Sequence, residues 1–184
     1  MEVSILIKEA KQGSAAAQKC LFDLFADSMM MLCRRYLKSK EDAEEVLIDG
    51  FCKFFKAIHS FTYRDEPALK AWLKRIMINE CLMVLRKNNI LSIVTEAAAE
   101  EIPFSDDVLS NLSAAEIFDL VVQLPVGYRT VFNLFVIEGT EHREIAKLMN
   151  ISEGTSKSQL SKARALLQKM LLQKGIEYVA TKTK

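Results

Sequence analysis

The 184-residue sequence has few of the residues that interrupt helices and no pattern typical of strands. It contains only 6 Gly and 3 Pro, and no run alternates convincingly between apolar and polar residues. Half of the residues are hydrophobic, so a real core can form and wholesale disorder is not expected. Because nearly all of the periodicity is helical, the sequence predicts an all-α protein.

The sequence also lacks long uninterrupted apolar runs. Charged residues break every apolar stretch before it reaches the length that spans a membrane. The first ten residues include Glu2, Lys8 and Glu9, which is wrong for a secretory signal. We therefore expect a cytoplasmic protein.

Patterns that carry metal or covalent chemistry are missing as well. The four cysteines form no CxxC pair and no His/Cys cluster, so a zinc site is not expected, and all four are predicted to be reduced and buried: Cys20, Cys33, Cys52 and Cys81. There is no glycine-rich phosphate loop and no Ser/His/Asp arrangement. His142 is expected to be solvated. The sequence predicts no enzyme, no cofactor, no metal and no small-molecule substrate.

Net charge is only +1, but the charges are unevenly distributed. Between Asn88 and Leu112 there are five acidic residues and no basic residue, and this composition indicates a linker. Helices are expected before and after it, at 15–37, 41–58, 67–87, 114–123, 125–139, 142–150 and from Ser152 onward. The prediction is two small helical domains, 1–88 and 113–175, with an acidic linker at 89–112 and a tail at 176–184.

The segment from His142 to Leu171 has the spacing of a helix-turn-helix, whose second helix enters the DNA major groove. Ser152 is a suitable N-cap for that second helix. From Gly154 to Lys174 there are five bases and no acid. One side is apolar, with Leu160, Ala163, Leu167 and Leu171, and the other carries Lys and Ser residues that can reach bases and phosphates. A basic solvated face on an ordinary helical hairpin is the alternative.

The pieces "LPVGYRTVF", "EIAKLMNISEGT" and "KSQLSKAR" resemble the promoter-binding C-terminal domain of bacterial sigma-70 family sigma factors, in particular the extracytoplasmic-function (ECF) group. The resemblance implies that Lys157, Ser158, Ser161 and Lys162 face the minus-thirty-five promoter element. Gln159 flanks them, and Arg129 is implied as a phosphate contact. The family usually has Ser where this chain has Glu141, so Thr140 is a candidate substitute cap for the first helix of the motif.

A second match lies in "KEDAEEVLIDGFCKFFKAI", which carries five acids within nine residues. A solvated acidic surface explains the charges alone. The string resembles the sigma-factor segment that docks on the clamp of the largest RNA polymerase subunit. By that resemblance Asp42, Glu45 and Asp49 face core RNA polymerase, and Phe51 supports the helix from within. Complementary charge of this kind speeds encounter and fixes register.

The third match is "FTYRDEPALKAWLKRIMINECLMVLRK", where aromatic residues precede a basic helix. Aromatic side chains beside basic side chains suit unpaired nucleotides, whose bases can stack on the rings while the basic groups neutralise the phosphates. The segment resembles the sigma-factor region that recognises and opens the minus-ten element. The resemblance implies that the loop Phe61–Glu66 holds a flipped base, and that the following residues take part: Phe61, Tyr63, Arg64, Lys70, Lys74, Arg75 and Asn79. Leu69, Trp72, Leu73 and Ile76 are expected in the core.

Together these segments predict a sigma factor that binds core RNA polymerase and promoter DNA. A stand-alone helix-turn-helix regulator and a helical adaptor are the alternatives. The resemblance also implies an anti-sigma partner, often membrane-bound.

Overall fold

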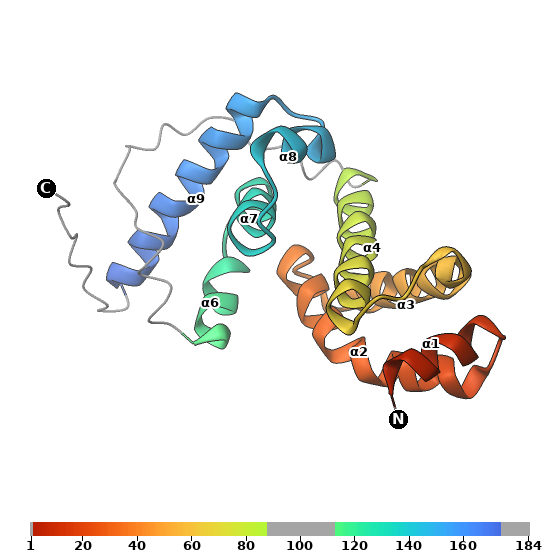
Figure 1. Cartoon of the computed structure of the whole chain (residues 1–184). Coiled ribbons are helices and arrows are strands. Elements are labelled where there is room, and N and C mark those ends of the chain that lie inside the picture. The colour runs from red at the N-terminus through yellow and green to blue at the C-terminus, as the bar shows by residue number, and fades with distance from the viewer. Residues whose placement is uncertain (1, 88–112, 174–184) are drawn as a thin grey trace, which may run out of the picture. The chain divides into compact units, whose positions relative to one another are not determined.

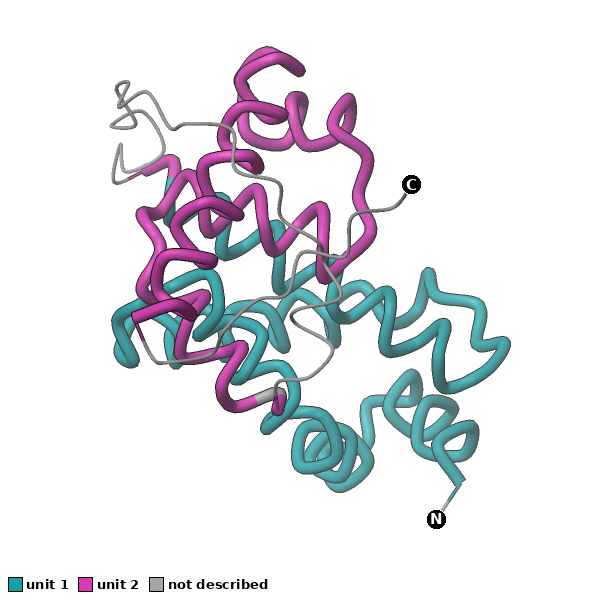
Figure 2. Tube along the Cα trace, turned by 90° about the vertical axis from the view of Figure 1, so that its left-hand side faces the viewer, with its two compact units in different colours: residues 1–85 teal, residues 86–184 magenta. Residues whose placement is uncertain are grey.

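A computed structural model describes residues 2–87 and 113–173, and this part of the chain is helical without any strand (Figure 1). The chain divides into two compact units, Met1–Leu85 and Arg86–Lys184 (Figure 2). The predicted all-α fold is therefore confirmed. The predicted acidic linker and C-terminal tail lie outside the described residues, and the predicted domain limits stay a prediction.

The first unit contains four α-helices and one short 3-10 helix: α1 (Val3–Lys11), α2 (Ala15–Tyr36), α3 (Lys40–Ala57), η1 (Ile58–Ser60) and α4 (Glu66–Lys87). Side-chain caps fix three of the helix starts. Ser14 accepts from the Ala17 amide at 3.3 Å and Ser39 accepts from the Asp42 amide at 3.0 Å. Asp65 Oδ1 accepts from the Ala68 amide at 2.7 Å, so α4 begins just before Pro67.

Apolar stripes on the helices form the core of this unit. α2 packs on α1 and α3, and α3 lies against α4 through the Phe54–Trp72 ring pair at 5.1 Å. The largest side chains at its centre are fully buried: Leu21, Met29, Tyr36, Phe54, Ile58, Leu69, Leu73 and Met77. An ion pair of 2.6 Å between Lys53 and the buried Glu80 also joins α3 to α4.

Within residues 113–173, the described part of the second unit has four α-helices and one π-helical segment: α6 (Ala114–Val121), α7 (Val126–Phe132), η3 (Asn133–Ile137), α8 (His142–Met149) and α9 (Glu153–Gln173). A capping box starts α6, because Ser113 and Glu116 each accept from the other's backbone amide. α9 packs on α6, α7 and α8. The four predicted apolar residues of α9, Leu160, Ala163, Leu167 and Leu171, are all buried.

The turn between α8 and α9 is three residues long, as the helix-turn-helix spacing predicts. Asn150 takes a left-handed conformation with φ 54°, and the Ile151 amide donates to the Ala146 carbonyl at 3.0 Å. Ser152 then accepts from the Thr155 amide at 2.9 Å, which confirms its role as the cap of α9. Glu141 stands at the N-cap of α8 without a side-chain cap bond, and Thr140 does not replace it.

The expectation of four buried cysteines is half wrong. Cys33 and Cys81 are buried, but Cys20 and Cys52 are exposed. Both exposed thiols lie on helix positions beside the apolar stripes rather than within them. Composition alone could not distinguish these two cysteines from the two buried ones. Of the predicted core residues of α4, Leu69 and Leu73 are buried, whereas Trp72 and Ile76 are half-buried.

None of the helices in residues 2–87 and 113–173 is both long and apolar enough to cross a membrane.

Candidate functional site

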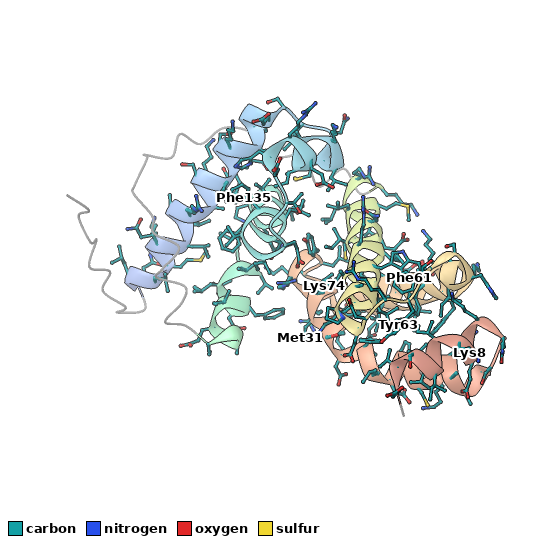
Figure 3. All side chains as sticks on the ribbon, in the orientation of Figure 1. Lys8, Met31, Phe61, Tyr63, Lys74 and Phe135 are labelled. Carbon is teal, nitrogen blue, oxygen red and sulfur yellow. The ribbon has the colours of Figure 1, made fainter. Side chains whose placement is uncertain are left out.

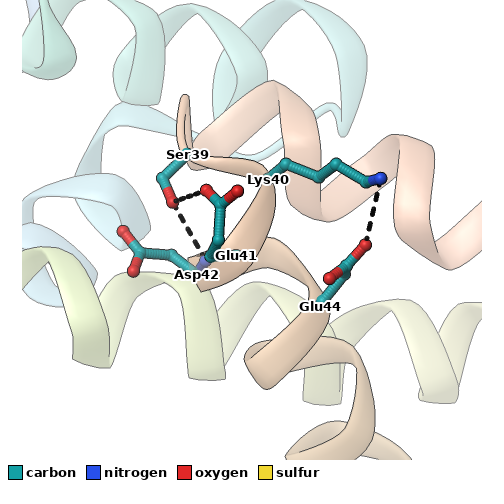
Figure 4. A network of polar contacts seen from close by, with 5 residues as sticks. All are labelled: Ser39, Lys40, Glu41, Asp42 and Glu44. Atoms are coloured by element: carbon teal, nitrogen blue, oxygen red, sulfur yellow. Dashed lines mark hydrogen bonds and ion pairs between the residues drawn. The ribbon is translucent and has the colours of Figure 1, made fainter.

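An acidic face lies on α3 and consists of Asp42, Glu45 and Asp49. Their spacing of three and four residues places them on one side of the helix. Glu45 and Asp49 are exposed and Asp42 is half-buried. Their neighbours Glu41 and Glu44 are already engaged: Ser39 Oγ donates to Glu41 at 3.0 Å, and Lys40 pairs with Glu44 at 3.5 Å (Figure 4). The acidic face therefore keeps carboxylates that no such local contact neutralises.

Phe51 lies on the buried side of α3. It is 3% exposed and packs against Phe22 of α2, with ring centroids 4.7 Å apart. Phe54 and Phe55 complete the same cluster at 6.2 and 6.0 Å from Phe51. This aromatic packing holds α3 on α2, so the acidic face is carried by a rigid support.

The aromatic loop joins η1 to α4 and comprises residues 61–65. Phe61 is half-buried, and its ring stacks on Trp72 of α4 with centroids 4.5 Å apart and planes 5° apart. Tyr63 is half-buried and Arg64 is exposed. At its far end, Asp65 caps α4 and accepts from Arg64 Nε at 3.0 Å. The carboxyl of Asp65 has a lowered pKa, chiefly because the Ala68 amide donates to it.

The basic face of α4 follows the loop directly in the chain. Lys70, Arg75 and Asn79 are exposed and Lys74 is half-buried. Phe61, Tyr63 and Lys74 therefore come from one continuous stretch of the first unit, running from the loop into α4 (Figure 3). Stacking groups followed by cations suit a single strand of nucleic acid.

The recognition face lies near the start of α9 and consists of Lys157, Ser158, Ser161 and Lys162. The first three are exposed and Lys162 is half-buried. The Ser158 hydroxyl donates to the Thr155 carbonyl at 3.0 Å, which leaves its oxygen able to accept from a base. These residues occupy the side of α9 opposite its buried leucines, as a helix that reads a groove requires.

Each of the two units matches a family of known proteins. A family profile described as "Sigma-70 region 2" matches residues 21–90, and one described as "Sigma-70, region 4" matches residues 114–167. The ECF RNA polymerase sigma factor SigW of Bacillus subtilis is 27% identical over 184 residues, covering 93% of this chain and 97% of that protein. The ECF RNA polymerase sigma-E factor of Haemophilus influenzae is 26% identical over 176 residues, covering 89% and 92%.

The chain belongs to the sigma-70 family of RNA polymerase sigma factors, in the ECF subfamily.

A solved structure shares the fold of this sigma factor. It is the sigma factor RpoE in complex with the anti-sigma factor NepR from Bartonella quintana, with a TM-score of 0.50 and 22% identity. The comparison covers 84% of this chain and 96% of that one.

Two residues expected to contact DNA are buried within the second unit. Arg129 is 2% exposed, and its guanidinium donates to the carbonyls of Val122 and Leu124 at 3.1 and 3.3 Å. It closes the turn between α6 and α7, so its guanidinium serves the fold of the second unit. Gln159 is 5% exposed, because it shares the core side of α9 with Ser156 and Ala163.

The expectation that His142 is solvated is also wrong. Its ring stacks on Phe135 at 4.3 Å, and its Nδ1 lies 2.9 Å from the hydroxyl of the buried Ser156. Burial is the largest cause that lowers the pKa of His142, followed by the positive charge of Lys157. His142 therefore ties α8 to both η3 and α9.

Three contacts that shape these surfaces were not expected from the sequence. Glu153 pairs with Lys157 at 2.8 Å, and its own pKa is lowered by that bond. The four-residue spacing from Glu to Lys could have indicated this pair. Trp72 lies under Phe61, and Lys11 of α1 contacts the Phe61 carbonyl at 2.6 Å. No local pattern could have connected Lys11 to a residue fifty positions away.

No group of three or more His, Cys, Asp and Glu residues suited to a metal ion occurs among the described residues.

Proposed function

We propose that this sigma factor uses four surfaces for three tasks. The acidic face of α3 binds the clamp of the largest subunit of core RNA polymerase. The recognition face of α9 selects the minus-thirty-five element. The aromatic loop captures an unpaired base of the minus-ten element, and the basic face of α4 neutralises the phosphates beside it. In this division of labour the chain supplies binding energy and performs no bond chemistry.

The observation that carries this proposal is the opposite charge of the docking and DNA-reading helices. α3 presents exposed carboxylates at Glu45 and Asp49, whereas α9 presents exposed Lys157 beside Ser158 and Ser161. A protein surface of one charge sign could attract either a basic clamp or acidic DNA, but not both. Joining the two binding units in one chain makes the second contact effectively intramolecular, which raises avidity when the span fits.

The test compares two sets of neutralising substitutions on α3. The set Asp42→Asn, Glu45→Gln and Asp49→Asn should weaken binding to core polymerase by about tenfold or more, since close interfacial charge pairs couple by about 1.5 kcal/mol or more. Glu41→Gln with Glu44→Gln is the matched control, because both carboxylates already have local partners. Binding is measured by competition against a labelled sigma factor for core enzyme. Equal affinity of the two sets would contradict the proposed docking face.

We further propose an anti-sigma partner for this chain. The RpoE structure from Bartonella quintana, which shares this fold, contains the anti-sigma factor NepR. Such a partner, soluble or membrane-bound, should release core polymerase from this chain when added to the purified complex. Persistence of the complex with the host's anti-sigma candidates would contradict this part. Because the polymerase works in the cytoplasm, we propose the same location for this chain.

A further inference from the structure

We propose that Lys11 is a positioning residue for the aromatic loop, and that α1 acts as a brace for base capture. This inference rests on the proposed function of that loop. α1 lies before residue 21, where the match to the region 2 profile begins. The brace is therefore an element of this chain outside the matched region.

The contact that carries the inference joins α1 to the first residue of the loop. Lys11 Nζ donates to the Phe61 carbonyl at 2.6 Å, and the Lys11 side chain is half-buried. A charged donor on a main-chain carbonyl makes a stronger hydrogen bond than a neutral one. The ammonium group thus holds the backbone where the loop leaves η1.

α1 is itself firmly seated, so Lys11 has a fixed base. Leu6, Ile7 and Ala10 are buried, and α1 packs on both α2 and η1. The helix ends in a defined turn, in which Gly13 has φ 85° and its amide donates to the Ala10 carbonyl at 3.0 Å. Ser14 caps α2 immediately afterwards. These contacts fix the position of Lys11 relative to the rest of the first unit.

Phe61 is consequently held at three points. Its amide donates to the carbonyl of the fully buried Ile58 at 3.2 Å, its carbonyl accepts from Lys11, and its ring stacks on Trp72. The other end of the loop is fixed where Asp65 caps α4. A loop that is ordered before the base arrives loses less conformational entropy on binding, so it binds more tightly.

A direct phosphate contact by Lys11 is the rival explanation, and the sole tryptophan allows a test that needs no DNA. Trp72 is the only Trp in the chain and lies against Phe61. Lys11→Met should shift Trp72 emission to longer wavelength and increase its quenching by acrylamide by about twofold, as expected when a covering group is released. Lys8→Met is the matched control: Lys8 lies on the same helix, is exposed and carries the same charge (Figure 3).

The second measurement uses full-length protein in reconstituted holoenzyme. Binding to a forked template with an unpaired minus-ten strand should weaken by roughly tenfold in Lys11→Met, the loss expected at the low end for one hydrogen bond from a charged donor. Lys11→Arg keeps a charged donor and should recover most of it. The dependence of affinity on salt should stay unchanged, whereas loss of a phosphate contact lowers that slope by about one. Circular dichroism at the same temperature checks that each variant is folded.

The outcomes separate this inference from the proposed function. Identical Trp72 quenching in Lys11→Met and Lys8→Met overturns the brace, as does a lower salt slope in Lys11→Met alone. A changed Trp72 signal with wild-type affinity for the forked template overturns the role of Lys11 in base capture. If the wild-type chain fails to open promoters with core enzyme, the proposed function fails, while the Trp72 comparison still decides whether Lys11 positions the loop.

Discussion

At the scale of single residues, the protonation of the His142 imidazole is linked to the stability of the second unit. Burial lowers its pKa below the ordinary value of 6.5, so the folded state favours the neutral ring. The unfolded chain then binds more protons just below that value. The stabilisation is complete above the unfolded pKa and is lost as pH falls through the lower folded pKa.

We therefore expect the free energy of unfolding of the second unit to fall as pH drops from about 7.5 to about 5.5, through the range where histidine ordinarily titrates. His142→Gln should reduce this pH dependence. His59→Gln is the control, since His59 is exposed and lies in the other unit. Denaturant titrations at both pH values provide the measurement. An unchanged pH dependence in His142→Gln would show that the ring does not couple folding to protonation.

Arg129 shows that a cation in a DNA-binding unit can serve the fold instead of the ligand. Arg129→Met should destabilise the second unit by about 3 kcal/mol, because it removes a charged donor and leaves the carbonyls of Val122 and Leu124 without it. Arg143→Met removes an exposed arginine of α8 and should cost little. Thermal unfolding distinguishes them. If Arg129→Met is as stable as the wild type but its DNA affinity depends less steeply on salt concentration, the result would support a phosphate contact by Arg129 instead.

At the scale of elements, Glu153 serves the stability of α9 but opposes the positive charge of the recognition face that we propose for DNA binding. Glu153 interacts favourably with the positive end of the helix, but it also pairs with Lys157 of the recognition face. An ion pair between exposed groups is weak, so under the proposed DNA contact of Lys157 the free-energy cost of breaking the pair is small.

Glu153→Gln should strengthen binding to minus-thirty-five DNA by about two- to fivefold at low salt, since an exposed pair is worth up to about 1 kcal/mol. Glu144→Gln removes the same charge from α8 and controls for the general change in net charge. Fluorescence anisotropy with duplex DNA measures both. Equal gains from the two substitutions would mean that the Lys157 pair has no specific effect.

At the scale of the whole molecule, the chain forms two compact units, each with a core of its own. Trp72 reports on the first unit alone because it is the only tryptophan. Leu167→Ala opens a cavity at a fully buried position of α9 and should destabilise the second unit by about 2–5 kcal/mol.

The helical circular dichroism of Leu167→Ala should therefore show an early partial transition, while the Trp72 emission transition stays at its wild-type temperature. Leu172→Ala is the control on the same helix, because Leu172 is 54% exposed. Coincident transitions by both probes in Leu167→Ala would show that the two units unfold as one.

The sequence by itself determined most of the helices, the cap at Ser152 and the helix faces that carry charge. Periodicity and capping are local properties, so Ser152 and the buried leucines of α9 could be predicted from neighbours within a few positions. The acidic face of α3 and the recognition face of α9 follow from the same local geometry. Family resemblance added the proposal that the acidic face binds polymerase and the recognition face binds DNA.

Tertiary structure alone decided which of the charged and aromatic residues support the fold. Arg129 and His142 are polar residue types that usually lie at the surface, but Arg129 is buried and His142 is half-buried against other elements. Trp72 lies under the loop and Lys11 holds its first carbonyl, because folding packs α1 on η1 and places the Trp72 ring of α4 against Phe61. Such contacts depend on how distant segments pack, and packing is set by the complete core, not by the order of residues within one helix.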